Sequence, residues 1–255
     1  MSLPSGYNRW CRRYRPAEHA AVRLVCFPHA GGSAPFYLPM AAALSPGVDV
    51  VAIQYPGRQE RLAERPIADL MVLADHICDV LRGQPEMPMT FFGHSMGALV
   101  AFEVARRLEA DGHGPSRLFA SGCRAPSACR DEGFHLLDDA RLLAQVRRLN
   151  GTNSAVLADE ELMRATLPAL RADCAAAEGY SCAPQTAVSC PVSVLVGDND
   201  PKASLADARA WVRHTSGAFD LKVFPGGHFF LADRADEIMR ILDRHFRIER
   251  DRIVA

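Results

Sequence analysis

Six short apolar segments, most of them rich in β-branched or aromatic residues, recur along the 255-residue chain and constrain its fold most strongly. They occupy residues 22–27, 48–53, 89–92, 117–121, 192–196 and 219–224. Helical patterns lie between several of them, at residues 67–82, 97–110, 202–214 and 233–246. Strands that alternate with helices predict an α/β fold, with a mostly parallel central sheet and helices on both faces. Residues 10–15 are a candidate edge strand.

The alternation breaks between residues 124 and 190. Two helical patterns, at 138–149 and 159–180, follow each other without a strand, and the turn-forming residues LNGTN separate them. Such an insertion either extends the core or forms a lid over the sheet. Because insertions carry function more often than the scaffold does, we predict a lid at 124–190 within a single domain that spans 1–255.

Composition excludes several functional classes. The formal net charge is −1, which favours neither nucleic acid nor an anionic membrane as a partner. The first ten residues, MSLPSGYNRW, lack the apolar core of a secretion signal, and no apolar run reaches the roughly 18 residues of a membrane span. We therefore expect a cytoplasmic protein. Its eight cysteines form no CxxC pair, which predicts buried or idle thiols rather than disulfides or a zinc site: Cys11, Cys26, Cys78, Cys123, Cys129, Cys174, Cys182 and Cys190.

Ser95 lies in the motif Gly93-His94-Ser95-Met96-Gly97, which fits G-x-S-x-G. A predicted strand precedes the motif and a strong helical pattern follows it, which is the context of a nucleophile elbow. In that turn the serine hydroxyl stands clear at the carboxyl end of the sheet, and the amino end of the helix favours developing negative charge. The alternative is a structural serine in a tight turn.

A serine hydroxyl needs a general base and an acid that orients the base. Among the nine histidines, His228 is distinct because it lies in FPGGHFFL, directly after a predicted strand and before the last helix. Two glycines let this loop bend over the end of the sheet. We therefore predict His228 as the general base.

The acid is expected between the serine and the histidine, which is the chain order of elbow hydrolases. The segment VSVLVGDNDPKA ends a strand with two candidates, Asp198 and Asp200. Asp200 precedes Pro201, which biases it toward an extended conformation, whereas Asp198 could cap the turn. We favour Asp200 and keep Asp198 as the alternative.

Two backbone N–H groups are expected to stabilise the oxyanion. One belongs to Met96, the residue after the nucleophile. The other should come from the loop after the first core strand, where this chain has PHAGGSA at residues 28–34. Small residues there let the backbone approach a substrate closely. Ala30 is the favoured second donor and Gly31 the next.

Six segments together resemble the type II thioesterases of polyketide and nonribosomal peptide synthesis: CFPHAGGSA, YPGRQER, GHSMGA, LNGTN, GDNDP and FPGGHFF. The resemblance runs from about residue 10 to residue 245 and implies the α/β-hydrolase fold. It implies removal of aberrant or stalled acyl groups from the phosphopantetheine arm of acyl or peptidyl carrier proteins, without a metal or redox cofactor. It carries the catalytic roles onto Ser95, Asp200 and His228 and the oxyanion role onto Ala30 and Met96. Asn153 departs from the expected pattern.

Two other functions fit the same residues. A carboxylesterase or lipase would use the same groups on free oxygen esters, and an α/β-hydrolase-fold binding protein would use none of them. For the carrier protein, a basic rim is a candidate surface, although solvated arginines explain it equally well: Arg12, Arg13, Arg15, Arg147 and Arg148. Arg58 and Arg61 are candidates to order their loop through hydrogen bonds. We expect a monomer.

Overall fold

A computed structural model describes residues 7–84, 86–128, 130–149 and 160–254 of the chain. Its central sheet has the strand order β1-β3-β2-β4-β5-β6-β7. The strands are β1 (Cys11–Arg12), β2 (Arg23–Phe27), β3 (Asp49–Ile53), β4 (Met89–His94), β5 (Arg117–Ser121), β6 (Val192–Gly197) and β7 (Phe219–Phe224). Only β1 runs antiparallel, so the predicted α/β fold with a mostly parallel sheet is confirmed.

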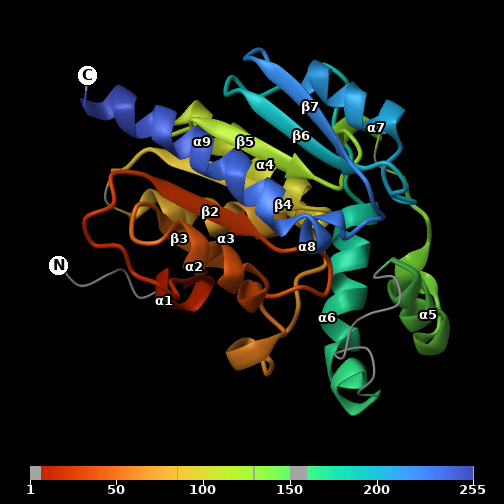
Figure 1. Cartoon of the computed structure of the whole chain (residues 1–255). Helices are drawn as coiled ribbons and strands as arrows, with labels where there is room; N and C mark the ends of the chain where they lie inside the picture. The colour runs from red at the N-terminus through yellow and green to blue at the C-terminus, as the bar shows by residue number, and fades with distance from the viewer. Residues whose placement is uncertain (1–6, 85, 129, 150–159, 255) are drawn as a thin grey trace.

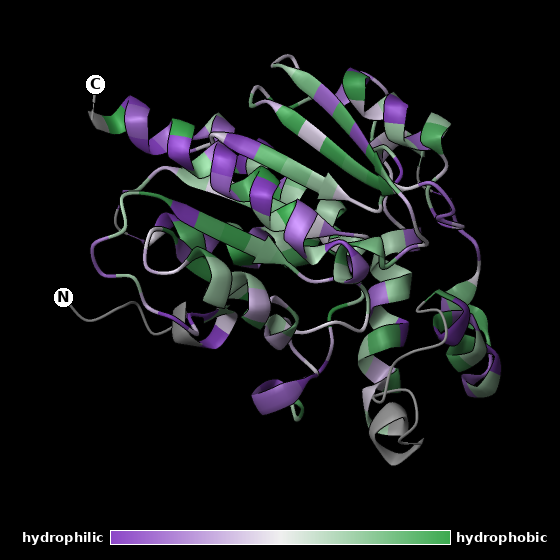
Figure 2. Ribbon diagram, in the orientation of Figure 1, coloured by the Kyte–Doolittle hydropathy of each residue, from purple (hydrophilic) through white to green (hydrophobic). Residues whose placement is uncertain are grey.

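Helices cover both faces of this sheet (Figure 1). On one face lie α3 (Leu70–Arg82) and α4 (Met96–Ala110), and on the other lie α2 (Leu38–Leu44) and α9 (Ala235–Val254). Alternate residues of β2 serve the two cores, since Val25 packs with α3 and α4 while Leu24 packs with α2 and α9. Figure 2 shows these strands as mostly hydrophobic ribbons between helices that carry the polar residues.

The segment between β5 and β6 contains no strand among its described residues. It holds the 3-10 helices η3 (Pro126–Ala128) and η4 (Phe134–Leu136), followed by α5 (Asp139–Leu149) and α6 (Glu160–Glu178). Both helices stand beyond the carboxyl ends of the strands (Figure 1). Leu142 of α5 packs against Leu167 and Leu170 of α6 in a small core of their own. Asn153 and Cys129 lie outside the described residues.

The boundaries of several elements differ from the sequence-based expectation. The edge strand is only two residues long, and residues 202–214 form the short helix α7 (Leu205–Arg209) and the 3-10 helix η6 (Ala210–His214). Helix α2 was not among the helical patterns predicted from the sequence, and its first turn contains Pro39. A proline is tolerated in the first turn of a helix, where its missing N–H has no partner to lose.

None of the helices among the described residues has the length and apolar character required to cross a membrane.

Candidate active site

Ser95 occupies the sharp turn between β4 and α4. Its φ of 55° lies in a region that residues with a side chain seldom adopt. The turn depends on its two glycines: a Cβ on Gly93 would lie 2.5 Å from the Cα atom of Ala98, and one on Gly97 would lie 2.6 Å from the carbonyl oxygen of Pro28 and closer still to that of Phe27. The chain therefore crosses itself too tightly here for any other residue type.

His228 connects Ser95 to Asp200. Its Nε2 atom lies 3.0 Å from the Oγ atom of Ser95, and its Nδ1 atom lies 2.9 Å from each carboxylate oxygen of Asp200. An ionised carboxylate only accepts hydrogen bonds, so Nδ1 carries the proton and Nε2 accepts from the serine hydroxyl. The three residues predicted from the sequence thus form one hydrogen-bonded chain, in which His228 and Asp200 are buried.

The two candidate carboxylates occupy different environments. Asp200 also accepts a hydrogen bond of 2.8 Å from the backbone N–H of Lys202, which holds it in place behind His228. Asp198 is exposed, and its Oδ1 atom accepts from the N–H of Gly226 at 3.0 Å. Asp198 therefore ties two loops together, while Asp200 contacts the imidazole.

Two further histidines, His29 and His94, border His228. The ring of His94 lies 5.1 Å from that of His228 and 5.8 Å from that of His29, centroid to centroid. Burial, with smaller contributions from the neighbouring His228 and Arg58, lowers the pKa of His29 to about 3, and burial also lowers the pKa of His94 well below its usual value. Both rings therefore remain neutral beside His228. His29 was not predicted from the sequence, where its only signal is its place in PHAGG.

The candidate oxyanion donors lie close to Ser95. Ala30 and Met96 both line the cavity that contains the serine. Among the described residues, no hydrogen bond engages the N–H of either one. Gly31 differs, because its N–H donates to the Oδ2 atom of Asp173 at 2.7 Å. The second choice for the oxyanion donor is therefore wrong in this geometry: that N–H is already bonded.

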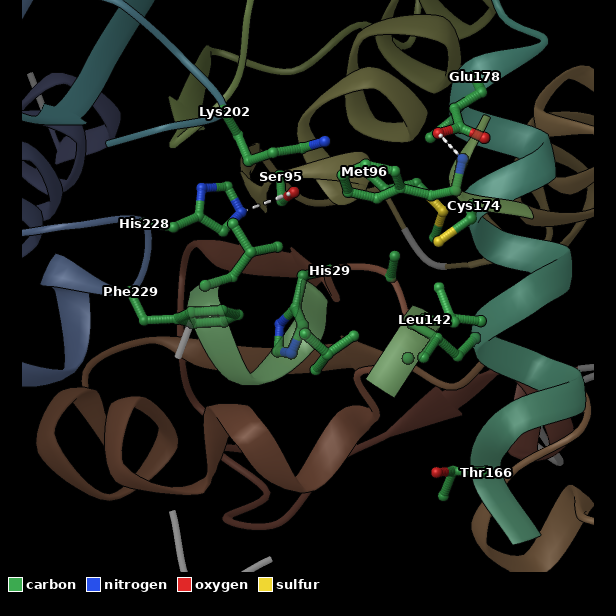
Figure 3. A pocket seen from close by; sticks show the side chains of 17 residues that line it. His29, Ser95, Met96, Leu142, Thr166, Cys174, Glu178, Lys202, His228 and Phe229 are labelled. Carbon is green, nitrogen blue, oxygen red and sulfur yellow. Dashed lines mark hydrogen bonds between the residues drawn. The ribbon is translucent and has the colours of Figure 1, made fainter. Parts of the chain in front are cut away.

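A cavity of about 250 Å³ opens beside Ser95 and His228. Its wall is largely apolar and comes from α5, α6 and the loop after β2, and Figure 3 shows Leu142 and Thr166 at the side remote from the serine. The apolar lining residues include Ala30, Met96, Phe134, Leu142, Val146, Leu149, Leu170, Ala177 and Phe229. The cavity can hold an acyl chain next to the serine hydroxyl.

A second, smaller cavity of about 90 Å³ also contains Ser95 and Met96. Charged residues line it, namely Arg124, Arg130, Glu132, Glu178 and Lys202. The ammonium of Lys202 lies 3.9 Å from the ring centroid of Phe134 and contacts Glu132. Glu178 and Lys202 line the larger cavity as well, so the two cavities share these charged residues beside Ser95.

The arginines singled out in the sequence have identifiable partners. Arg58 forms a buried ion pair with Asp173, and Arg61 bonds the carbonyl oxygen of Gln54 at 2.7 Å, so both order their loop as expected. In the proposed basic rim, Arg12 contacts Glu60 and Arg13 lies 2.7 Å from Asp49. Three others are exposed: Arg15, Arg147 and Arg148.

The mostly parallel sheet, the strained serine and the Ser–His–Asp arrangement together define a serine hydrolase of the α/β-hydrolase class. A family model described as the Thioesterase domain matches residues 22–246. The chain belongs to this thioesterase family, whose members hydrolyse thioesters.

Individual relatives support the assignment to the thioesterase family. "Thioesterase PikA5" of Streptomyces venezuelae is 48% identical over 255 residues, covering 98% of this chain and 89% of the relative. The "Probable cadicidin biosynthesis thioesterase" of Streptomyces griseus is 53% identical over 230 residues, covering 90% of this chain but only 64% of the longer relative. The solved structure of the type II thioesterase BorB from the borrelidin biosynthetic cluster superposes with a TM-score of 0.89 at 49% identity, covering 93% of this chain and 97% of BorB.

Proposed function

We propose that this thioesterase hydrolyses acyl groups from the phosphopantetheine arm of acyl or peptidyl carrier proteins through an acyl-serine intermediate on Ser95. The observation that carries the proposal is the hydrogen-bonded chain Ser95–His228–Asp200 at the edge of a largely apolar cavity. A reactive hydroxyl beside an apolar chamber suits an acyl chain whose carbonyl carbon lies at the mouth of the chamber.

In this mechanism His228 accepts the Ser95 proton at Nε2 as Oγ attacks the thioester carbonyl. The N–H groups of Met96 and Ala30 donate to the oxyanion, and Asp200 holds the protonated imidazole in its orientation. Collapse of the intermediate breaks the carbon–sulfur bond, and the proton on Nε2 passes to the departing thiolate. Water then gives its proton to His228 as it attacks the acyl-serine, which releases the carboxylic acid and restores Ser95.

The insertion at 124–190 serves in this proposal as a lid that shapes the acyl chamber. Its helices α5 and α6 supply Leu142, Val146, Leu170 and other wall residues. A monomer suffices, because every residue assigned a role lies in one chain. The exposed Arg147 and Arg148 of α5 are candidate contacts for an acidic carrier protein.

The relatives support the carrier-protein substrate. The names of two curated relatives, "Probable cadicidin biosynthesis thioesterase" and "Gramicidin S biosynthesis protein GrsT", place those proteins in biosynthesis. The solved relative BorB is a type II thioesterase of a biosynthetic cluster. Editing of stalled carrier-bound chains is the reaction that fits this chain best in such a setting.

The test compares an acyl carrier protein thioester with a p-nitrophenyl ester of the same acyl group. We expect a higher kcat/KM for the carrier-bound thioester, and loss of both activities in Ser95→Ala. A strong preference for the oxygen ester, with no advantage from carrier loading, would favour a carboxylesterase. Unchanged hydrolysis by Ser95→Ala would exclude the mechanism.

A further inference from the structure

Asp173 of α6 is a buried carboxylate that the mechanism leaves unused. Only 1% of its side chain is exposed, and it accepts three hydrogen bonds. The Nη1 and Nη2 atoms of Arg58 lie 2.6 and 2.8 Å from its two oxygens, and the N–H of Gly31 lies 2.7 Å from Oδ2. One carboxylate thus joins α6 to the loop after β3 and to the loop after β2.

The position of these bonds matters because they hold the loop that contains Ala30. The Gly31 N–H that donates to Asp173 belongs to the Ala30–Gly31 peptide unit. This unit adjoins, through the Cα atom of Ala30, the His29–Ala30 unit that carries the Ala30 N–H, the proposed oxyanion donor, so the orientations of the two N–H groups are coupled. Arg58 also donates from Nη1 to the carbonyl oxygen of Gly32 at 2.9 Å. The N–H of Gly32 bonds the carbonyl oxygen of His29 at 2.9 Å, which closes the turn.

Packing between α6 and this loop is equally close. Gly31 has a φ of +73°, and a Cβ there would lie 3.0 Å from the Cδ1 atom of Leu170. Leu170 and Asp173 are three positions apart on α6 and therefore share a face of the helix. Burial alone would lower the pKa of Arg58, but the neighbouring Asp173 carboxylate outweighs that effect and raises it. Arg58 therefore keeps its charge in the interior.

We propose that Asp173, held by Arg58, is a positioning residue: it accepts the Gly31 N–H and thereby aims the Ala30 N–H at the oxyanion. This inference rests on the proposed function. A misplacement of about 1 Å at such a donor can cost roughly 10²-fold in rate.

Two double variants separate positioning from stability. Arg58→Met/Asp173→Asn and Arg58→Met/Asp173→Leu both remove the buried charges, but only the asparagine keeps an oxygen that can accept from Gly31. For the leucine variant we expect kcat for an acyl carrier protein thioester to fall about 10- to 100-fold below that of the asparagine variant, with KM within about threefold. Thermal unfolding of both variants measures any loss of folded protein.

A trifluoromethyl ketone analogue of the acyl group provides the second readout. Ser95 Oγ adds to its carbonyl carbon, the hydroxyl proton passes to His228, and the carbonyl oxygen becomes an oxyanion. The inhibition constant should rise in the leucine variant in parallel with the fall in kcat/KM. Binding of the acyl carrier protein to the same variants in a Ser95→Ala background should not change.

Equal kcat values in the two double variants, or a loss confined to KM, would overturn the inference. If neither variant folds, amide hydrogen exchange of the unaltered enzyme decides: the Gly31 N–H should be protected with and without the ketone, and exchange at the rate of a free amide would refute its bond to Asp173. The proposed function is tested separately, on the unaltered enzyme and Ser95→Ala, by comparing the carrier-bound thioester with the oxygen ester.

Discussion

The Nε2 atom of His228 lies 3.0 Å from the Oγ atom of Ser95, although 133 positions separate the two residues in the chain. The contact arises because Ser95 follows β4 and His228 lies in the loop after β7, and parallel strands present their carboxyl ends at one edge of the sheet. The buried Asp200 follows β6, which lies next to β7 in the sheet and is separated from β4 by β5. Asp200 therefore reaches His228 from the neighbouring strand.

Replacing His228 with alanine should reduce turnover by roughly 10⁴- to 10⁶-fold, because Ser95 loses the group that accepts its proton. The fold should persist, as judged by circular dichroism and thermal unfolding. Turnover within tenfold of the unaltered enzyme would remove His228 from the mechanism.

The two aspartates after β6 should respond differently to the same substitution. Asp200→Asn should lower kcat by about 10⁴-fold, because an amide can favour the wrong imidazole tautomer. Asp198→Asn is the matched control, since its amide oxygen can still accept from Gly226. Steady-state kinetics on an acyl thioester would compare them, and a larger loss in Asp198→Asn would reverse our assignment of the acid.

The elbow should not tolerate a single added methyl group. Gly97→Ala would force a Cβ to within 2.6 Å of the Pro28 carbonyl oxygen, so we expect a loss of at least about 2 kcal/mol in the free energy of unfolding. Gly227→Ala is the control, because a Cβ there meets no atom within 4 Å. Denaturant unfolding would measure both, and equal stabilities would contradict the close crossing of the chain.

Acyl-chain preference should follow the volume of the cavity. Val146→Trp places a larger side chain in the cavity wall, and each methylene that loses its buried site costs about 0.8 kcal/mol. Hydrolysis of octanoyl thioesters should therefore fall roughly tenfold or more in kcat/KM, while acetyl thioesters change little. Val212→Trp, at an exposed position, should leave both unchanged. Equal losses for both chain lengths would place the acyl group elsewhere.

Stability should fall as the solution is acidified below the ordinary pKa of histidine. Burial lowers the pKa of His29 to about 3, so between about 6.5 and 3 the unfolded chain binds a proton at this residue that the folded chain does not. Stability therefore rises with pH across this window and is complete above it. Each such group contributes a slope of up to about 1.4 kcal/mol per pH unit.

The His29→Phe variant isolates this contribution. Phenylalanine keeps an aromatic ring between Phe36 and Phe229, and it removes a buried Nδ1 atom that lacks a hydrogen bond among the described residues. Unfolding free energies measured from pH 4 to 7 should show a smaller slope than in the unaltered protein. An unchanged slope would mean that His29 is protonated in the folded state.

Much of the fold follows from local sequence patterns. Residues 117–121 and 219–224 form strands with the expected bounds. Short apolar or alternating runs between turn residues are typical of β-strands. The helix expected at 233–246 instead runs from Ala235 to Val254. Its last turns are mainly polar, so the apolar periodicity that predicts a helix is absent there.

The candidate site was predictable at the positions where tight backbone geometry requires glycine. Gly93 and Gly97 mark the tight crossing at Ser95, and the loop around His228 carries two glycines. No comparable sequence signal pointed to Asp173. A lone aspartate within a helical pattern is ordinarily solvated, and only the packing of α6 against the loop after β2 reveals that it is buried beside Arg58.

The Arg58–Asp173 pair also makes the free-energy cost of an outward movement different for the two inserted helices, α5 and α6. Moving α6 outward would strand a guanidinium in the protein interior, at a cost of about 3–5 kcal/mol. Helix α5 has one fully buried side chain, Leu142. If the insertion acts as the lid of our proposal, we therefore expect a long acyl chain to enter on the α5 side, because moving α5 breaks no buried ion pair.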